Sequence, residues 1–145
     1  MSNLDKLMSM NAEDTPDPVE VSEGQFRFNV KTYKVDEVGE NKTPKVTVIV
    51  GVTDVIDADE FDPANIPNAT PVRMEFWGTD KALAQRSAAR SLKQFLCGAL
   101  ELPEELPYGE LLEMSINIEF VGQVKIEMEG RDNDIPTPRI NRIIT

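Results

Sequence analysis

The chain has 145 residues, of which 40% are hydrophobic, so it can bury one sizeable core and is expected to form one domain. Cys97 is the only cysteine and there is no histidine, which excludes an internal disulfide and a structural zinc site within one chain. No stretch is apolar over the length of a bilayer and the N-terminus lacks a signal-peptide pattern. We therefore expect a soluble cytoplasmic protein with no membrane partner.

The net charge of −11 argues against nucleic acid as a partner until its distribution is considered. Residues 1–23, 54–62 and 101–113 each carry a net charge of −5, which leaves +4 for the rest of the chain. The first of these segments lacks sustained periodicity, so we predict an acidic arm over 1–23 and a folded domain over 24–145. The sequence does not decide whether such an arm packs on its own domain or on a neighbouring subunit. A homo-oligomer is therefore one alternative.

Two strands and a turn are the first predicted elements of the domain. Apolar and polar side chains alternate through residues 24–31, and valines recur at every second position through 45–53. This period of two is typical of strands that are buried on one face. The polar segment 36–43 between them contains Gly39 and suits a turn, so the pattern predicts a β-hairpin.

Residues 54–71 form a long acidic connection that contains three prolines. A loop of this length in a small domain usually has an ordered course or a function, such as covering a sheet edge or crossing a binding face. Its carboxylates suggest calcium, but the spacing lacks the glycine turn and the later glutamate of an EF-hand loop. A solvated acidic loop is the favoured interpretation, and no metal site is predicted.

Residues 72–100 predict a strand, a corner at Gly78 and one long helix. The strand pattern covers 72–77, and Thr79 or Asp80 suits the helix N-cap. Gly98 is a plausible end of the helix, since Pro103 follows closely. The apolar residues that recur on one side of the helix are Leu83, Ala88, Leu92, Phe95, Leu96 and Ala99.

In the remainder of the chain, alternating patterns predict a strand that is interrupted at Gly122 and a closing strand. Residues 101–109 are a proline-rich connector, and 110–121 suggest a short helical turn followed by a strand that alternates from Met114 onward. Gly122 marks a bend, residues 124–129 alternate again, and 139–144 close the chain as a final strand. The predicted order is three strands, a helix and two strands. This is the order of a mainly β, five-stranded Greek-key barrel of the OB-fold kind, in which the helix lies between strands 3 and 4. A sandwich or an open roll is the alternative.

The chain has no phosphate-binding loop, nucleophile elbow or Cys–His pair, so we predict no catalytic residues, no cofactor and no enzyme. Cations and aromatic rings on strands suit single-stranded nucleic acid, whose phosphates and bases they contact. Trp77 is out of phase with the apolar row of its strand, so it is expected to face outward beside Arg73, although a tryptophan packed at a strand end is the alternative. The predicted nucleic-acid-binding residues are Arg27, Lys31, Tyr33, Lys45, Arg73, Trp77, Lys125, Arg131, Arg139 and Arg142.

Four segments carry a resemblance to a known family: EGQFRFNVKTYKVDEVGENKTPKVTVIVGV, MEFWGTDKALAQRSAARSLKQFLCGAL, VGQVKIEMEGRDND and PRINRIIT. In this layout the chain resembles small phage-encoded single-stranded DNA-binding proteins. The resemblance implies an OB-fold relative that protects single strands during replication or recombination, in the host cytoplasm, with replication or recombination proteins as partners. Phage and bacterial members commonly end in an acidic tail, whereas residues 139–145 here contain no acid, so recruitment through such a tail is in doubt.

Two hypotheses follow from the sequence. The first is a non-enzymatic single-stranded DNA-binding protein with little sequence preference, which would bind in a salt-sensitive manner. The second is an acidic protein–protein interaction module, such as a phage structural or host-inhibitory protein, whose surface meets a basic partner or mimics DNA. Element order and resemblance favour the first hypothesis.

Overall fold

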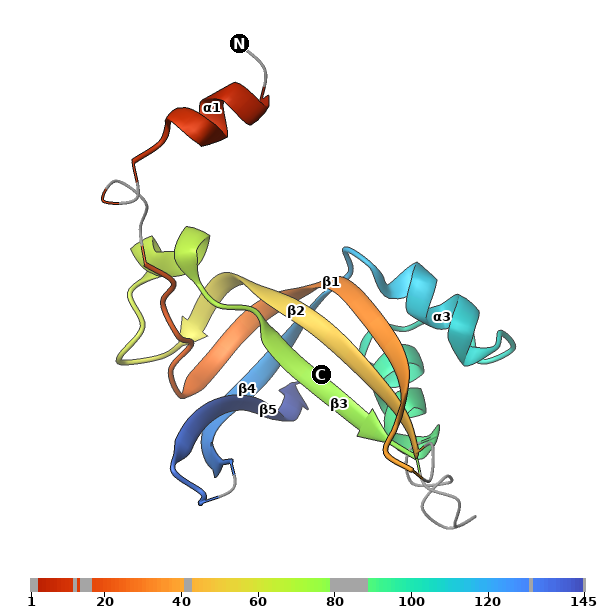
Figure 1. Cartoon of the computed structure of the whole chain (residues 1–145). Helices are drawn as coiled ribbons and strands as arrows, with labels where there is room; N and C mark the ends of the chain where they lie inside the picture. Colours follow the sequence, from red (N-terminus) through yellow and green to blue (C-terminus); the bar gives the residue numbers. More distant parts are fainter. Residues whose placement is uncertain are drawn as a thin grey trace.

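The protein is a mainly β structure built around one antiparallel sheet (Figure 1). This computed structural model describes residues 3–11, 13, 17–40, 43–78, 89–130 and 132–144. The strands in these residues are β1 (Gly24–Val38), β2 (Thr43–Asp57), β3 (Val72–Trp77), β4 (Glu119–Glu129) and β5 (Ile135–Ile144). The helical elements are α1 (Asn3–Ser9), the 3₁₀ helix η2 (Pro63–Asn68), the π-helical turn η3 (Gln94–Ala99) and α3 (Tyr108–Ser115).

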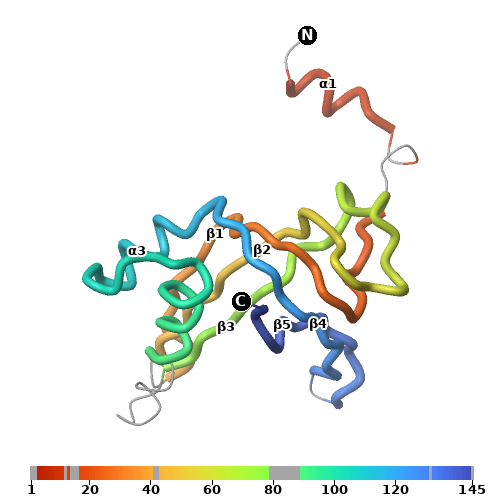
Figure 2. Tube along the Cα trace, turned by 180° about the vertical axis from the view of Figure 1, so that it is seen from behind, coloured from red at the N-terminus to blue at the C-terminus, as the bar shows by residue number. Residues whose placement is uncertain are grey.

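The strand order in the sheet is β3-β2-β1-β4-β5, so β4 returns to lie beside β1 in a Greek key. The sheet curls until β3 and β5 approach each other, but the described strands do not pair there and the barrel stays open at this seam. Seen from behind, η3 and α3 lie at one end of the sheet, between β3 and β4 in the chain (Figure 2). The predicted five-stranded OB-like arrangement is therefore confirmed.

A bulge in β1 changes which side chains face outward. Val30 pairs with Val50 and Thr32 with Ile49, so Lys31 is an extra residue on its strand. An extra residue reverses the alternation of every side chain that follows it. Strict alternation along the strand predicts Tyr33 on the outer face with Lys31, and this prediction is wrong. Tyr33 pairs with the buried Val48 and packs against the core, while its neighbour along the strand, Lys34, takes the outer face.

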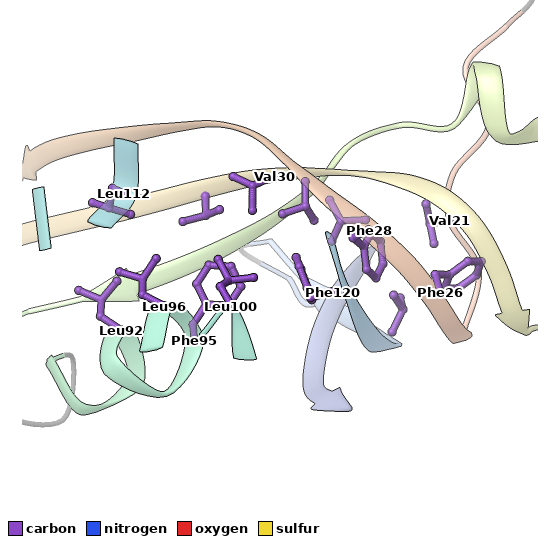
Figure 3. Packing of buried hydrophobic residues seen from close by; sticks show 14 of the residues in the cluster. Val21, Phe26, Phe28, Val30, Leu92, Phe95, Leu96, Leu100, Leu112 and Phe120 are labelled. Atoms are coloured by element: carbon purple, nitrogen blue, oxygen red, sulfur yellow. The ribbon is translucent and has the colours of Figure 1, made fainter. Parts of the chain in front are cut away.

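The core fills the curled sheet and extends under the helical region (Figure 3). Phe95 on η3 meets Phe120 on β4 edge to face, with ring centroids 5.3 Å apart, and Phe76 on β3 at 6.0 Å. Burial of such rings dominates core energetics, so these contacts tie the helical region to the sheet. The residues with no more than 1% of their surface exposed include Val21, Phe26, Phe28, Val30, Val48, Val50, Phe95, Leu96, Leu111 and Val124.

Element boundaries differ from the prediction in the second half of the chain. Residues 110–115 belong to α3, so Met114 lies in a helix and not in a strand, and β4 begins at Glu119. The long predicted helix is described from residue 89 onward and ends with η3, so its apolar residues Leu92, Phe95 and Leu96 are buried as expected. Thr79, Asp80, Leu83 and Ala88 lie outside the described residues.

The end of the predicted arm and the acidic connection pack together on the domain. Val19 forms a bridge with Ala69, and Val21 is part of the core. The connection contains η2, whose first turn is capped by the carboxylate of Asp62, and its Phe61 lies edge to face on Phe26 at 5.5 Å. It therefore has an ordered course of its own. By contrast, α1 stands apart from the sheet and has no buried residue.

Candidate nucleic-acid interface

Three neighbouring strands present a grid of mostly polar side chains on the outer face of the sheet. The register of β1, β2 and β3 sets the rows Asp36, Lys45 and Trp77; Lys34, Thr47 and Glu75; and Thr32, Ile49 and Arg73. In OB folds, the face of the second and third strands and the loops beside it contact oligonucleotides. The grid occupies this position.

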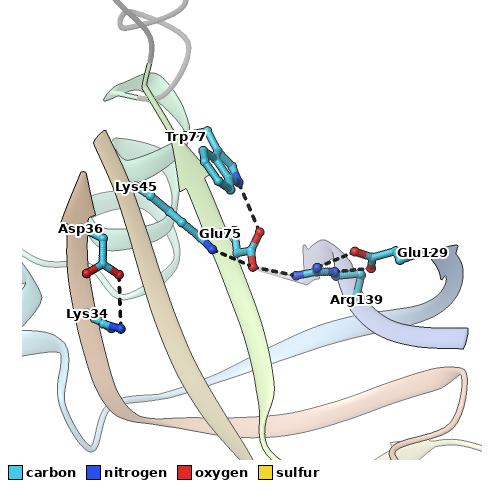
Figure 4. Close-up of polar contacts among 7 residues, drawn as sticks. All are labelled: Lys34, Asp36, Lys45, Glu75, Trp77, Glu129 and Arg139. Carbon is cyan, nitrogen blue, oxygen red and sulfur yellow. Dashed lines mark hydrogen bonds and ion pairs between the residues drawn. The ribbon is translucent and has the colours of Figure 1, made fainter. Parts of the chain in front are cut away.

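Trp77 lies outward at the end of β3, as the sequence predicted, with 44% of its surface exposed. Its indole Nε1 donates a hydrogen bond to Glu75 Oε2 at 3.2 Å, and the Lys45 ammonium lies 4.7 Å from its ring centroid (Figure 4). A cation near an aromatic face is attracted by the ring quadrupole. The ring is thus held at its edge by a carboxylate and at its face by an ammonium group.

Glu75 lies at the centre of this cluster, with 21% of its side chain exposed. Lys45 Nζ lies 3.4 Å from its Oε1, and Arg139 Nη1 reaches the same oxygen from β5 at 3.6 Å. Partial burial alone favours a neutral carboxyl, but the hydrogen bond from Trp77 and the charges of Arg139 and Lys45 outweigh it and hold the pKa of Glu75 below its ordinary value. The carboxylate is therefore ionised at neutral pH.

Arg139 links the two strands that border the open seam. Its Nε and Nη2 donate to the two carboxylate oxygens of Glu129 at 2.6 and 2.7 Å, and its Nη1 faces Glu75 on β3. This bidentate geometry is the strongest form of arginine–carboxylate contact. The hydrogen bonds from Arg139 lower the pKa of Glu129, and Glu129 raises the pKa of the guanidinium in turn. Any phosphate at this point has to compete with two carboxylates.

The seam between β3 and β5 is hollowed. A hollow of about 460 Å³ is lined by side chains that include Arg73, Glu75, Trp77, Glu127 and Arg139. A second hollow of about 330 Å³ shares Arg73, Glu75 and Arg139 with the first and continues toward Thr70. Both volumes lie in the range of about 300–1,000 Å³ that is usual for small-ligand sites. We call these two hollows together the seam groove. Its lining includes both cationic and anionic side chains.

The remaining predicted site residues are scattered. Arg27 lies 3.7 Å from Asp54, and Lys31 is exposed on the outer face with its side chain across Gly51. Tyr33 turns inward and donates a hydrogen bond to Glu113 on α3, which raises the pKa of the tyrosine. It is therefore not a stacking platform on the grid.

Two more cations lie in other hollows. Lys125 lines one with acidic neighbours from the end of β2, including Asp57 and Asp59. Arg142 lines another with Gln94 of η3. Arg131 lies outside the described residues. Of the ten residues predicted, Arg73, Trp77 and Arg139 line the seam groove. Lys45 is joined to Trp77 and Arg139 through Glu75 (Figure 4). Lys31 lies on the outer face of β1 beside Gly51.

Sequence reasoning missed two residues of this face. Lys34 lies beside Thr47 in the grid and 3.5 Å from Asp36, because the bulge brings it outward. Glu75 is the second, because a pattern of cations and aromatic rings does not include a carboxylate. Its position two residues before Trp77 on the same strand face was the available signal, since side chains at i and i+2 of a strand point the same way.

The fold and this face define an OB-like β protein whose exposed tryptophan lies between cations and carboxylates. Comparison with protein-family models gives no match, and a search of curated proteins gives none either. In the described part of the chain, no three acidic or cysteine side chains are grouped so that they could hold a metal ion. The helices in the same part are all too short or too polar to cross a bilayer.

Proposed function

We propose that the protein binds single-stranded DNA without catalysing a reaction. The observation that carries this proposal is the exposed Trp77 beside Lys45, Arg73 and Arg139, at the position where OB folds contact oligonucleotides. A base stacks on the indole, and the cations contact the phosphates on either side of it. The process we propose is phage DNA replication or recombination, which rests on the resemblance in layout alone.

The charge balance of the grid supports this proposal although the chain is anionic. Within the grid the cations are Lys34, Lys45 and Arg73 and the carboxylates are Asp36 and Glu75, and Lys31 adds a cation on the outer face of β1. Arg73 forms no ion pair with a described carboxylate, so it is free to take a phosphate. Most residues of the acidic segments lie elsewhere, in the arm, in the connection before β3 and at the helical end, whereas Glu20 at the end of the arm lines the second hollow with Arg73.

The test is the fluorescence anisotropy of a labelled mixed-sequence oligonucleotide titrated with the full chain at low and at high salt. Binding that weakens as salt rises supports the proposal, because neutralised phosphates release counterions. A matched duplex of the same sequence is the control and should bind more weakly, since its bases are not available for stacking. Absence of binding at low salt overturns the proposal.

One observation favours the second candidate, an acidic protein–protein interaction module. Helix α1 exposes Leu4, Leu7 and Met8 on a segment that carries no buried residue, and this is typical of a surface that awaits a protein partner. In that case the oligonucleotide titration is flat, and affinity capture with the full chain returns a basic protein.

A further inference from the structure

We propose that Glu75 selects among bases at Trp77, so that the groove favours cytosine and adenine over thymine. This inference rests on the proposed single-stranded DNA binding. It concerns which bases the site accepts, which depends on the residues of the site.

The carboxylate of Glu75 lies beside the indole of Trp77, the proposed stacking surface. Trp77 Nε1 donates to Glu75 Oε2 at 3.2 Å, so this oxygen lies at the edge of the indole. A base that stacks on the ring therefore brings its own edge close to Glu75. Both side chains line the same hollow of about 460 Å³, which gives the base a place to lie.

The carboxylate of Glu75 can still accept a hydrogen bond from a base. An ionised carboxylate only accepts hydrogen bonds and offers about four lone-pair sites. Lys45 and Arg139 both face Oε1, and Trp77 takes one site on Oε2. One site on Oε2, the oxygen beside the ring, remains for a donor from the base. The low pKa of Glu75 keeps the group ionised at neutral pH and thus unable to donate.

The bases differ in the hydrogen-bonding groups at their edges. Cytosine and adenine each carry an exocyclic amino group, and a carboxylate accepts a hydrogen bond from it. Thymine has a carbonyl at the corresponding position, and its one ring N–H lies between two carbonyl oxygens, which a carboxylate repels. A partly buried acceptor left facing an acceptor loses the hydrogen bond and is desolvated without compensation. Thymine is therefore the disfavoured base.

The experiment compares labelled oligo-dC, oligo-dA and oligo-dT of equal length at pH 7.5 and one low salt concentration, using the full chain. The wild-type protein should bind oligo-dC and oligo-dA about tenfold or more tighter than oligo-dT, the ratio that a hydrogen bond to a charged group supplies. Equal binding of the three, or tighter binding of oligo-dT, overturns the selectivity while leaving DNA binding intact. Failure to bind any of them overturns the proposed function itself and this inference with it.

Two variants separate a base contact from a change in overall charge. Glu75→Gln removes the charge but can donate to thymine carbonyls through its amide, so the preference should fall to within about twofold. Glu127→Gln removes the same charge from an exposed residue of the same hollow, so it should strengthen binding to all three oligonucleotides and keep their ratio. An unchanged ratio in Glu75→Gln overturns the proposal. Should Glu75→Gln fail to fold, the wild-type ratio and Glu127→Gln still decide it.

Discussion

The guanidinium of Arg139 on β5 lies 3.6 Å from the carboxylate of Glu75 on β3, so an ion pair spans the one seam at which the described sheet is not hydrogen-bonded. Glu129 holds the same guanidinium through two hydrogen bonds. The open barrel is therefore bridged at this point by side chains and not by its backbone. This relationship sets both the stability of the seam and the availability of Arg139 for a ligand.

Replacing Arg139 should loosen the seam. Arg139→Gln removes the positive charge and the bidentate contact, and it leaves Glu75 and Glu129 as neighbouring carboxylates without their shared partner. We expect a lower midpoint of thermal unfolding at pH 7, measured by circular dichroism, with the same folded spectrum. Lys125→Gln removes a cation of the same hairpin that pairs with no described carboxylate, and it should leave the midpoint nearly unchanged. Equal midpoints for the wild type and Arg139→Gln would contradict this account.

The same contacts make the stability depend on pH. Arg139 lowers the pKa of Glu129, and Trp77 with Arg139 and Lys45 lowers that of Glu75, against an ordinary value of 4.5 for both. A carboxyl with a depressed pKa in the folded state adds stability above its unfolded pKa and loses it as the pH falls through the folded pKa. The unfolding midpoint should therefore drop as the pH is lowered below 4.5, and more steeply for the wild type than for Arg139→Gln. Parallel curves would show that these contacts do not carry the dependence.

Trp77 should contribute to binding and not to folding. Trp77→Ala is expected to weaken oligonucleotide binding by about 1–3 kcal/mol, the usual worth of base–aromatic stacking. Trp77→Phe keeps an aromatic face and should lose less. Because the side chain is 44% exposed, both variants should unfold near the wild-type temperature. A Trp77→Ala protein that unfolds early would instead assign the indole to the core.

Arg73 should contact a phosphate. Arg73→Ala is expected to reduce the slope of log affinity against log salt by about 0.7, the value for one phosphate contact on a single strand. Arg142→Ala is the matched control, because Arg142 lines a hollow beside η3 and not the seam groove. Its slope should equal that of the wild type. Equal reductions in the two variants would mean that the DNA follows a different path on the protein.

Phe95 should hold the helical region on the sheet. Its ring is 1% exposed and contacts Phe76 and Phe120, so Phe95→Ala removes apolar surface and leaves a cavity. The free energy of unfolding in urea should fall by about 3–5 kcal/mol. Gln94→Ala changes the exposed neighbour and should cost little. A small loss for Phe95→Ala would mean that the helical end packs independently of the sheet.

The regular part of the fold follows from period-two alternation and element order. Residues 24–31 and 45–53 predicted the first hairpin, and the outward position of Trp77 followed from its phase against Val72, Met74 and Phe76. Sequence pattern alone did not reveal the bulge at Lys31, because an extra residue is fixed by the curvature of the paired strands. That single residue moved Tyr33 inward and Lys34 outward.

The candidate site was harder to predict because its contacts are long-range. Lys45, Glu75 and Arg139 come from β2, β3 and β5, and the seam groove exists because the sheet curls and brings its outer strands together. Strand patterns give the face of each residue but not which distant strand lies beside it. Net charge was a poor guide as well, since most of the acid lies in segments outside the grid.

The most direct test of the central claim uses the fluorescence of Trp77, the single tryptophan of the chain. Titration of the full-length protein with an unlabelled single-stranded oligonucleotide at low salt should change the emission in a saturable manner, because a base stacks on the indole, and added salt should restore it. Emission that stays constant through the titration at low salt would contradict the account.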